Sequence, residues 1–192
     1  AEVVLLDNKF ATMVDVVMEG RLVTNNIARS ASMYYLGTLF TFILSMISMV
    51  SNNTYPFIPI QMTIMSMFVE GMPSTLITFE SSHAKPKEPI LRQVLRNILP
   101  IGISLATAYI LLFAFNLGVV QRETMLYYTT AFLSYMLVVK LFQPMNWVRG
   151  GVLLISSTIL VGVCIVFYSL LNLIPLTQHE IIIVIALIAF IF

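Results

Sequence analysis

Long apolar runs alternate with short polar links along most of the chain. A helix needs about 20 predominantly apolar residues to cross the hydrocarbon core of a bilayer. The runs therefore predict an all-α, polytopic transmembrane helix bundle over residues 36–192. Its predicted spans lie at about 36–50, 58–79, 97–116, 125–143, 150–172 and 180–192. Because the final run is short for a crossing, we interpret it as the first part of a truncated helix.

The first 35 residues follow a different pattern. VVLL, within AEVVLLDNKF, is typical of a short buried strand. Apolar residues then recur at the spacing of one helical face, at Met13, Val16, Val17 and Ile27. No proline interrupts this stretch, so the pattern predicts one helix from about 11 to 50, roughly 60 Å long at 1.5 Å per residue. That length is about twice the hydrocarbon thickness, so residues 11–35 are expected to stand in water as a cytoplasmic stalk.

The composition indicates a membrane protein. Of the 192 residues, 59% are hydrophobic and 10% are charged, whereas a soluble domain carries about 25% charged residues. The lipid bilayer is therefore an expected partner, and nucleic acid is not. The single cysteine, Cys164, excludes a disulfide within the chain and is interpreted as a buried thiol. His83 and His179 lie far apart and show no zinc-site spacing.

Lysine and arginine residues fall mostly on one side of the predicted bundle. If the spans alternate in direction, that side holds Lys9, Arg21, Arg29, Lys85, Lys87, Arg92, Arg96 and Arg149. Lys140 lies near the same end of its own helix, and Arg122 falls on the opposite side. Because cytoplasmic loops of membrane proteins carry an excess of Lys and Arg, the pattern places the amino-terminal side in the cytoplasm.

An acidic residue, Glu70, lies near the middle of the second predicted span, in SMFVEGMPSTL. A charge at that depth costs from about 3 to more than 10 kcal/mol unless it faces a partner or a cavity. Ser66 and Thr63 precede it by about one and two turns. Gly71 loosens the helix, and Pro73 removes a backbone donor and frees carbonyl oxygens. Hard cations prefer oxygen ligands, so the segment predicts a cation site on Glu70, Ser66 and Thr63, with Glu70 and Ser66 holding the metal.

Alternative roles for these polar residues stay open. A protonated Glu70 would hydrogen-bond across helices and hold the bundle together. Thr41 and Ser45, in the first span, are weaker candidate ligands, because such residues more often serve helix packing in membranes. Gln61 is a further weak candidate that lies nearer the outer surface, where it would line an exit path.

Two stretches resemble the P-type cation-transporting ATPases. AEVVLLDNKFATMVDVVMEGRLVTNNIARS is similar to the end of their phosphorylation domain and the stalk helix, which carries an E-G-R-x-x-x-x-N-I pattern. The matching residues are Glu19, Gly20, Arg21, Asn26 and Ile27. PFIPIQMTIMSMFVEGMPSTL is similar to the P-x-x-P-x-Q…D-G-x-P pattern of calcium pumps. Its matching residues are Pro56, Pro59, Gln61, Gly71 and Pro73.

The resemblance implies a fold and a set of site residues. Residues 1–10 would be a remnant of the cytoplasmic phosphorylation domain, and the spans would be helices five to ten of a ten-helix transport domain. Glu70 falls where calcium pumps carry a cation-binding aspartate, and Ser66 where they carry a ligating asparagine. Val69 replaces a ligating threonine, and the spans corresponding to the fifth and eighth helices carry no acid. These departures imply at most one ion site, completed by a fourth helix outside this chain.

The function implied is ion translocation by an ATP-driven pump of the bacterial plasma membrane, with calcium as the expected cation. ATP and magnesium would bind in the intact pump, outside this chain, and no catalytic residue is expected here. The partner would be the amino-terminal half of the same pump, with its first four membrane helices and cytoplasmic domains. Pumps for magnesium, manganese or protons stay open as alternatives, as does a non-enzymatic channel-like or assembly protein.

Overall fold

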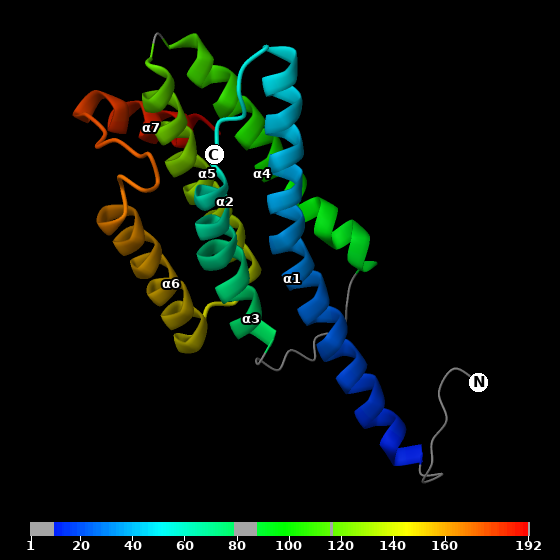
Figure 1. The fold of residues 1–192 in the computed structure, drawn as a ribbon. Coiled ribbons are helices and arrows are strands. Elements are labelled where there is room, and N and C mark those ends of the chain that lie inside the picture. The colour runs from blue at the N-terminus through cyan, green and yellow to red at the C-terminus, as the bar shows by residue number, and fades with distance from the viewer. Residues whose placement is uncertain (1–9, 79–87, 116, 192) are drawn as a thin grey trace.

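The computed structural model describes residues 10–78, 88–115 and 117–191, which form helices and the loops between them (Figure 1). This arrangement confirms the all-α class. The elements are α1 (Phe10–Val50), α2 (Pro59–Met65), η1 (Ser66–Gly71), α3 (Met72–Thr78), α4 (Ile90–Ala114), α5 (Val119–Leu141), α6 (Trp147–Val166) and α7 (Gln178–Ile191). The strand predicted at VVLL lies outside the described residues, as do Lys9, His83, Lys85 and Lys87.

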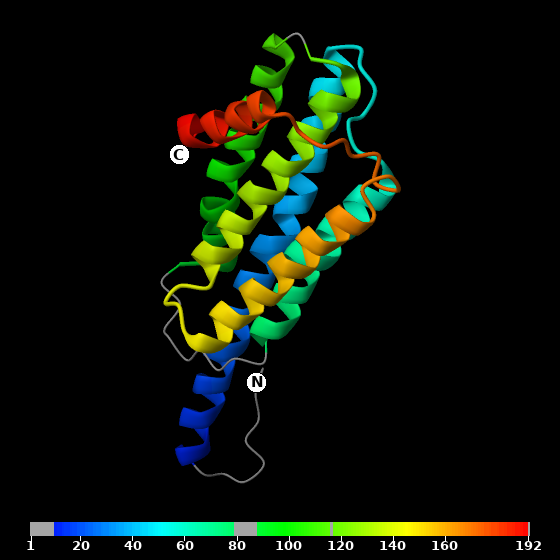
Figure 2. The same cartoon turned by 90° about the vertical axis from the view of Figure 1, so that its left-hand side faces the viewer.

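The first helix, α1, is uninterrupted. Its 41 residues extend about 60 Å at the rise of an α-helix. The amino-terminal part projects beyond the other helices (Figure 2). For that reason its apolar side chains are left uncovered by the described chain, and Val17 and Ile27 are 47% and 51% exposed. The carboxy-terminal part instead buries Leu36, Phe40 and Leu44 against the bundle.

Three of the described helices are long and apolar enough to cross a membrane, namely Thr12–Val50, Ile90–Phe113 and Trp147–Val166. Other predicted spans differ for identifiable reasons. The 58–79 run is divided into α2, η1 and α3. The helix α5 carries Arg122 and Glu123 near its start and Lys140 near its end, which lowers its mean hydropathy. The final helix, α7, is 14 residues long and crosses α4 and α5 instead of running alongside them (Figures 1 and 2).

The helix α6 ends at Val166, earlier than the end of the predicted 150–172 span. The chain then forms a turn in which Asn172 has a φ of 50°, in the left-handed region. Leu171 is fully buried in this turn, and its carbonyl oxygen accepts a 2.7 Å hydrogen bond from the Gln61 side chain. Of the apolar residues in this turn, Leu171 packs onto the bundle, whereas Phe167, Tyr168 and Leu170 are exposed, a difference that an apolar run does not reveal.

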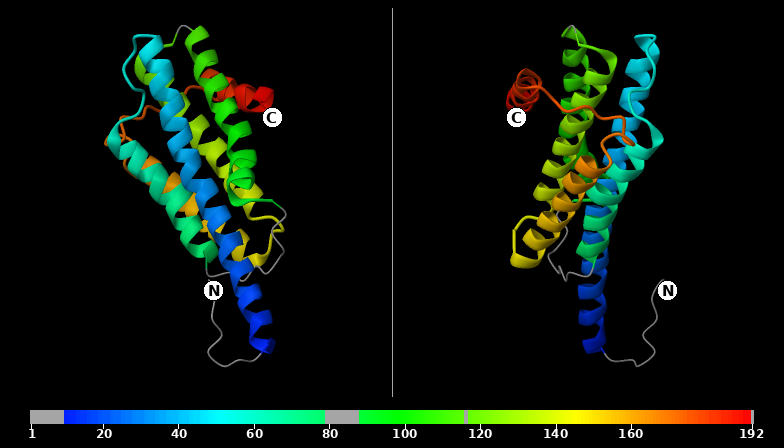
Figure 3. Two further views of the ribbon diagram at one scale, coloured as in Figure 1. Left: turned by 90° about the vertical axis from the view of Figure 1, so that its right-hand side faces the viewer. Right: turned by 60° about the vertical axis from the view of Figure 1, so that its left-hand side comes forward.

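The broken helix α2–η1–α3 lies on one side of α1, and α4 lies on the other (Figure 3). The α1–α4 approach is close, because a Cβ on Gly102 would lie 2.5 Å from Leu39 Cδ2. The loop before α2 is held by Phe57, whose ring makes edge-to-face contacts with Phe40 and Tyr127 at centroid distances of 6.5 and 6.1 Å. These contacts determine where the broken helix begins.

Arg149, one of the charges that suggested the orientation, is a buried structural residue. It is 7% exposed, and its guanidinium donates to the carbonyl oxygens of Phe142 and Pro144 at 2.9 and 2.7 Å. Its backbone N–H also donates to the Asn146 side chain at the start of α6. Arg149 therefore closes the α5–α6 turn.

Candidate cation site

The segment η1 is a π-helix, in which an N–H bonds the carbonyl oxygen five residues earlier instead of four. At its end the Met72 N–H donates to the Met67 oxygen. The irregular segment ends at Gly71, and Pro73 follows within the first turn of α3. A Cβ on Gly71 would lie 3.1 Å from the Ser66 oxygen, so the small residue suits this backbone. Single π-helical turns are rare and occur frequently at functional sites.

Pro73 removes the backbone donor that a carbonyl oxygen of the π-helix would use. In the five-residue pattern the Phe68 oxygen would pair with residue 73, but Pro73 has no N–H. The Tyr135 hydroxyl of α5 lies 3.4 Å from this oxygen and 3.0 Å from the Ser156 hydroxyl of α6. The Tyr135 side chain of α5 therefore supports the broken helix at the Phe68 carbonyl oxygen.

The carboxylate of Glu70 is packed directly against the backbone of α1. Glu70 is 6% exposed and hydrogen-bonds with the Ser66 side chain one turn earlier. Across the helix interface it meets Gly37, where a Cβ would lie 2.4 Å from Oε1 and 2.9 Å from Oε2. Such short distances mean that the carboxylate can occupy this position only because residue 37 has no side chain.

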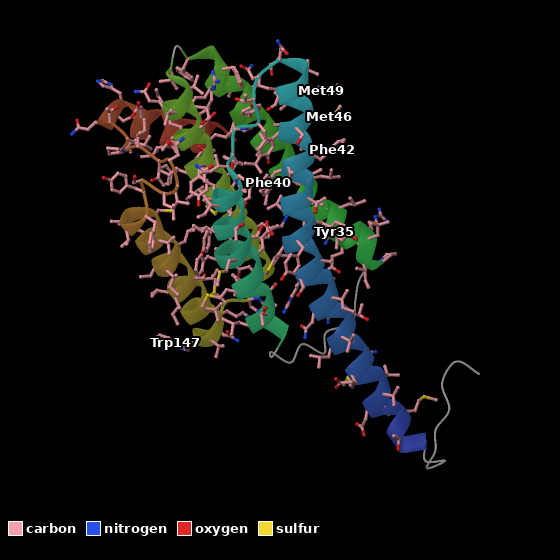
Figure 4. The ribbon with its side chains drawn as sticks, in the orientation of Figure 1. Tyr35, Phe40, Phe42, Met46, Met49 and Trp147 are labelled. Carbon is pink, nitrogen blue, oxygen red and sulfur yellow. The ribbon has the colours of Figure 1, made fainter. Side chains whose placement is uncertain are left out.

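A cavity of about 590 Å³ adjoins this carboxylate. Its walls come from α1 and from the broken helix, with Tyr34, Gly37, Thr38, Phe40, Thr41, Phe42, Met62, Ser66 and Glu70 as lining residues. Phe40 lies on the side of α1 that faces α2, whereas Tyr35, Phe42, Met46 and Met49 lie on its outer side (Figure 4). The lining residues Tyr34, Thr38, Phe42 and Ser66 are exposed, so the cavity is open at the surface of the described chain.

The cavity wall carries oxygen atoms of several kinds. The Thr41 hydroxyl donates to the Gly37 carbonyl oxygen at 2.8 Å, and the Thr38 hydroxyl donates to the Tyr34 carbonyl oxygen at 3.3 Å. Since each hydroxyl proton is used within α1, the oxygen lone pairs of Thr38 stay available, whereas the Thr41 hydroxyl also has the Tyr55 side chain as a partner. Together with the Glu70 carboxylate the two hydroxyls form the kind of oxygen set that suits a hard cation. In the described ranges there is no cluster of three or more His, Cys, Asp or Glu residues that would hold a metal.

Other candidate residues lie away from the cavity. Thr63 is exposed, and its hydroxyl donates to the Pro59 carbonyl oxygen at 3.0 Å. Ser45 is exposed and is not a lining residue. Gln61 is 3% exposed and ties two loops together, because it donates to Leu171 and its Oε1 accepts from the Ile58 N–H at 3.0 Å.

Among the lining residues of α1, Tyr34 and Gly37 are not residues that the sequence pattern singled out. The Tyr34 hydroxyl lies 3.1 Å from the Ser74 hydroxyl of α3 and so connects α1 to the broken helix one turn after Glu70. A signal was present, because residues 34, 37, 38 and 41 follow the three- and four-residue spacing of one helical face. That face identifies the wall of α1 that meets the broken helix.

Comparisons with known proteins agree with the resemblance noted in the sequence. No family model matches the chain. The chain is 31% identical over 173 residues to the probable cation-transporting ATPase exp7 of Streptococcus pneumoniae, a match covering 80% of this chain and 22% of that protein. It is 29% identical over 197 residues to the calcium-transporting ATPase CtpE of Mycolicibacterium smegmatis, covering 93% and 24%. The chain is a distant homologue of bacterial P-type cation-transporting ATPases.

The P-type ATPase relationship applies to a limited part of the relatives. The chain spans less than a quarter of the length of both relatives. With its all-helical structure and apolar helices, it corresponds to part of the membrane region of such an ATPase. This distant homology agrees with the resemblance at the two motifs around Gly20 and Gly71.

Proposed function

We propose that the chain is the ion-translocating part of an ATP-driven cation pump, with Glu70 as the main ligand of the transported ion. One observation carries the proposal: the buried carboxylate of a π-helical residue adjoins a cavity whose wall also carries hydroxyl oxygens. An ionisable side chain inside a membrane protein is costly and marks a functional site by default. The homology to cation-transporting ATPases supports the same conclusion.

Calcium is the cation that we propose first. It takes about six to eight oxygen ligands in flexible geometry. The two carboxylate oxygens of Glu70 and the hydroxyl oxygens of Ser66, Thr38 and Thr41 supply part of this set. The cavity is open at the surface of the described chain, and water or another segment of the full-length protein would complete the coordination there. A relative named as a calcium-transporting ATPase favours calcium over magnesium, manganese or protons.

The helix α1 is the proposed mechanical link. It forms one wall of the cavity and continues without interruption into the part that projects beyond the bundle. In the full-length pump, ATP and magnesium would bind in cytoplasmic domains, and phosphorylation there would move α1. A displacement of α1 shifts Gly37, Thr38 and Thr41 relative to Glu70, and would therefore change the affinity of the site for its cation. The amino-terminal half of the pump would supply the missing membrane helices.

The test is the formation of the phosphorylated intermediate from ATP in the full-length protein, titrated with calcium and separately with manganese. We expect calcium to activate phosphorylation in the wild type and the Glu70→Ala variant to lose this activation. Glu123→Ala is the matched control, because it removes an acid from α5 that lies outside the cavity.

Calcium-dependent phosphorylation that persists in Glu70→Ala would remove Glu70 from the site. Activation by manganese but not calcium would retain the pump and change its ion. Ion flux through purified protein without ATP would favour the channel-like alternative.

A further inference from the structure

Gly37 lies in direct contact with the Glu70 carboxylate. Of the two glycines in α1, Gly20 has open space around it, whereas a Cβ on Gly37 would overlap the Glu70 carboxylate. The three nearest atoms are Oε1 at 2.4 Å, Oε2 at 2.9 Å and Cδ at 3.0 Å. All three belong to the one group that the proposed pump requires for cation binding.

We propose that Gly37 is a positioning residue of the cation site: by lacking a side chain, it sets how closely the Glu70 carboxylate approaches α1. This inference rests on the proposed function of Glu70. The close approach brings the carboxylate to the helix that carries the Thr38 and Thr41 hydroxyls. Gly37 thereby controls the distances between the charged ligand and the neutral ones.

A side chain at residue 37 is expected to disturb the cation site and not the helix packing, because the Glu70 carboxylate is the group that would move. The overlapping atoms are the free end of a flexible side chain, so an added methyl displaces the carboxylate more readily than the helices. A Cβ and an oxygen approach no closer than about 3.4 Å in ordinary contact. The carboxylate must therefore shift by about 1 Å, and in enzymes a misplacement of that size can cost about a hundredfold in rate.

Gly102 provides the contrast that separates positioning from helix packing. Small residues commonly allow membrane helices to approach one another. Gly102 does this on α4, where a Cβ would meet the hydrocarbon atom Leu39 Cδ2 at 2.5 Å. Alanine at residue 102 therefore crowds α1 by a similar amount without touching the Glu70 carboxylate.

The experiment measures the half-saturating calcium concentration and the maximal level of phosphorylated intermediate in the full-length protein. The variants are Gly37→Ala, Glu70→Asp and the double variant, with Gly20→Ala and Gly102→Ala as controls. Aspartate is one methylene shorter, so it withdraws the carboxylate from the space that the alanine methyl would occupy. Thermal unfolding in detergent, followed in parallel, reports folding.

We expect Gly37→Ala to raise the half-saturating calcium concentration roughly tenfold to a hundredfold, with the maximal phosphorylation level largely kept. In the Glu70→Asp background the same substitution should raise the half-saturating calcium concentration less than threefold. The Gly20→Ala and Gly102→Ala proteins should keep the wild-type calcium dependence. If Gly37→Ala does not fold but the double variant does, the overlap with the carboxylate is equally supported.

Three results would overturn the role of Gly37: a wild-type calcium dependence in Gly37→Ala, an equal effect of the substitution in both backgrounds, or misfolding of Gly37→Ala that Glu70→Asp does not relieve. A failure of the proposed function is distinguishable from these. In that case the Glu70→Ala protein itself retains calcium-dependent phosphorylation.

Discussion

The candidate site uses one acidic side chain and several neutral oxygens. A divalent cation on Glu70 alone keeps an uncompensated positive charge, and the charge count of the ligands tunes cation affinity. The affinity of the complete pump therefore depends on what the rest of the protein adds at the cavity opening. Because the site has one carboxylate, its close approach to Gly37 is expected to affect cation affinity strongly.

Gln61 is expected to serve stability and not cation binding. Its side chain joins the loop before α2 to the turn after α6 through bonds to Ile58 and Leu171. In Gln61→Ala the buried Leu171 carbonyl oxygen and the N–H of the half-buried Ile58 lose their bonds, which should lower the free energy of unfolding by about 1–3 kcal/mol. Thermal unfolding and the calcium titration measure the two effects, with the exposed Gln178→Ala as control. An altered calcium affinity at unchanged stability would restore the exit-path interpretation.

The sequence singled out Glu70 but not all of the residues that line the cavity beside it. Glu70 stands out in any apolar run because a lone acid is costly there. The partners on α1 were harder to choose, because Thr41 lines the cavity and Ser45, one turn later, does not. Gly37 shares a helical face with Thr38 and Thr41 but has no ligand atom, and its importance arises from contact with another helix.

Among the helices, the π-helical turn has the largest effect on the site. The sequence predicted an irregularity from Gly71 and Pro73, but not its type. A π-helical turn alters the rotation from one residue to the next, so a polar stripe drawn with α-helical spacing does not stay on one face. Thr63 is accordingly exposed and lies outside the cavity, although Glu70 of the same broken helix adjoins the cavity.

The Tyr135 hydroxyl is expected to support this π-helical turn. Tyr135→Phe removes the hydroxyl near the Phe68 carbonyl oxygen. Because that oxygen has no backbone donor while Pro73 is present, we expect a loss of about 1–2 kcal/mol in stability and a weaker calcium affinity. The measurement is again unfolding and calcium titration, with Tyr128→Phe on the same helix as control. Equal behaviour of the two variants would argue against support of the π-helix by Tyr135.

Arg149 is expected to hold α5 and α6 together. In Arg149→Met the carbonyl oxygens of Phe142 and Pro144 lose a charged donor. Hydrogen bonds of this kind contribute about 1.5–3 kcal/mol each, so the unfolding temperature should fall clearly. Lys140→Met, which removes an exposed charge near the same turn, should leave it close to the wild-type value. The prediction fails if both variants unfold at the same temperature.

At the scale of the whole molecule, the orientation in the membrane stays a prediction. The charge pattern places the projecting part of α1 in the cytoplasm and the α4–α5 connection outside. Cysteine labelling of the full-length protein tests this, in a Cys164→Ala background that removes the chain's one native thiol. An impermeant reagent applied to intact cells should modify Gly118→Cys and should leave Arg21→Cys unmodified until the membrane is opened. The reverse pattern would contradict the orientation.

The overall architecture was more predictable than its details. The length of α1 follows from a helical pattern without proline, and the all-α class follows from the apolar runs. The early end of α6 and the crosswise position of α7 depend on contacts between distant segments, such as Gln61 with Leu171. Such contacts are not encoded in the hydropathy of one segment.

The most direct test of the central claim is equilibrium binding of radioactive calcium to the purified full-length protein, in the wild type and in Glu70→Gln. Glutamine keeps the size and hydrogen-bonding capacity of the side chain but removes its charge. We expect saturable binding of one ion in the wild type and at least tenfold weaker binding in Glu70→Gln. Equal calcium affinity in the two proteins would contradict a cation site on Glu70 and would favour the hydrogen-bonding role instead.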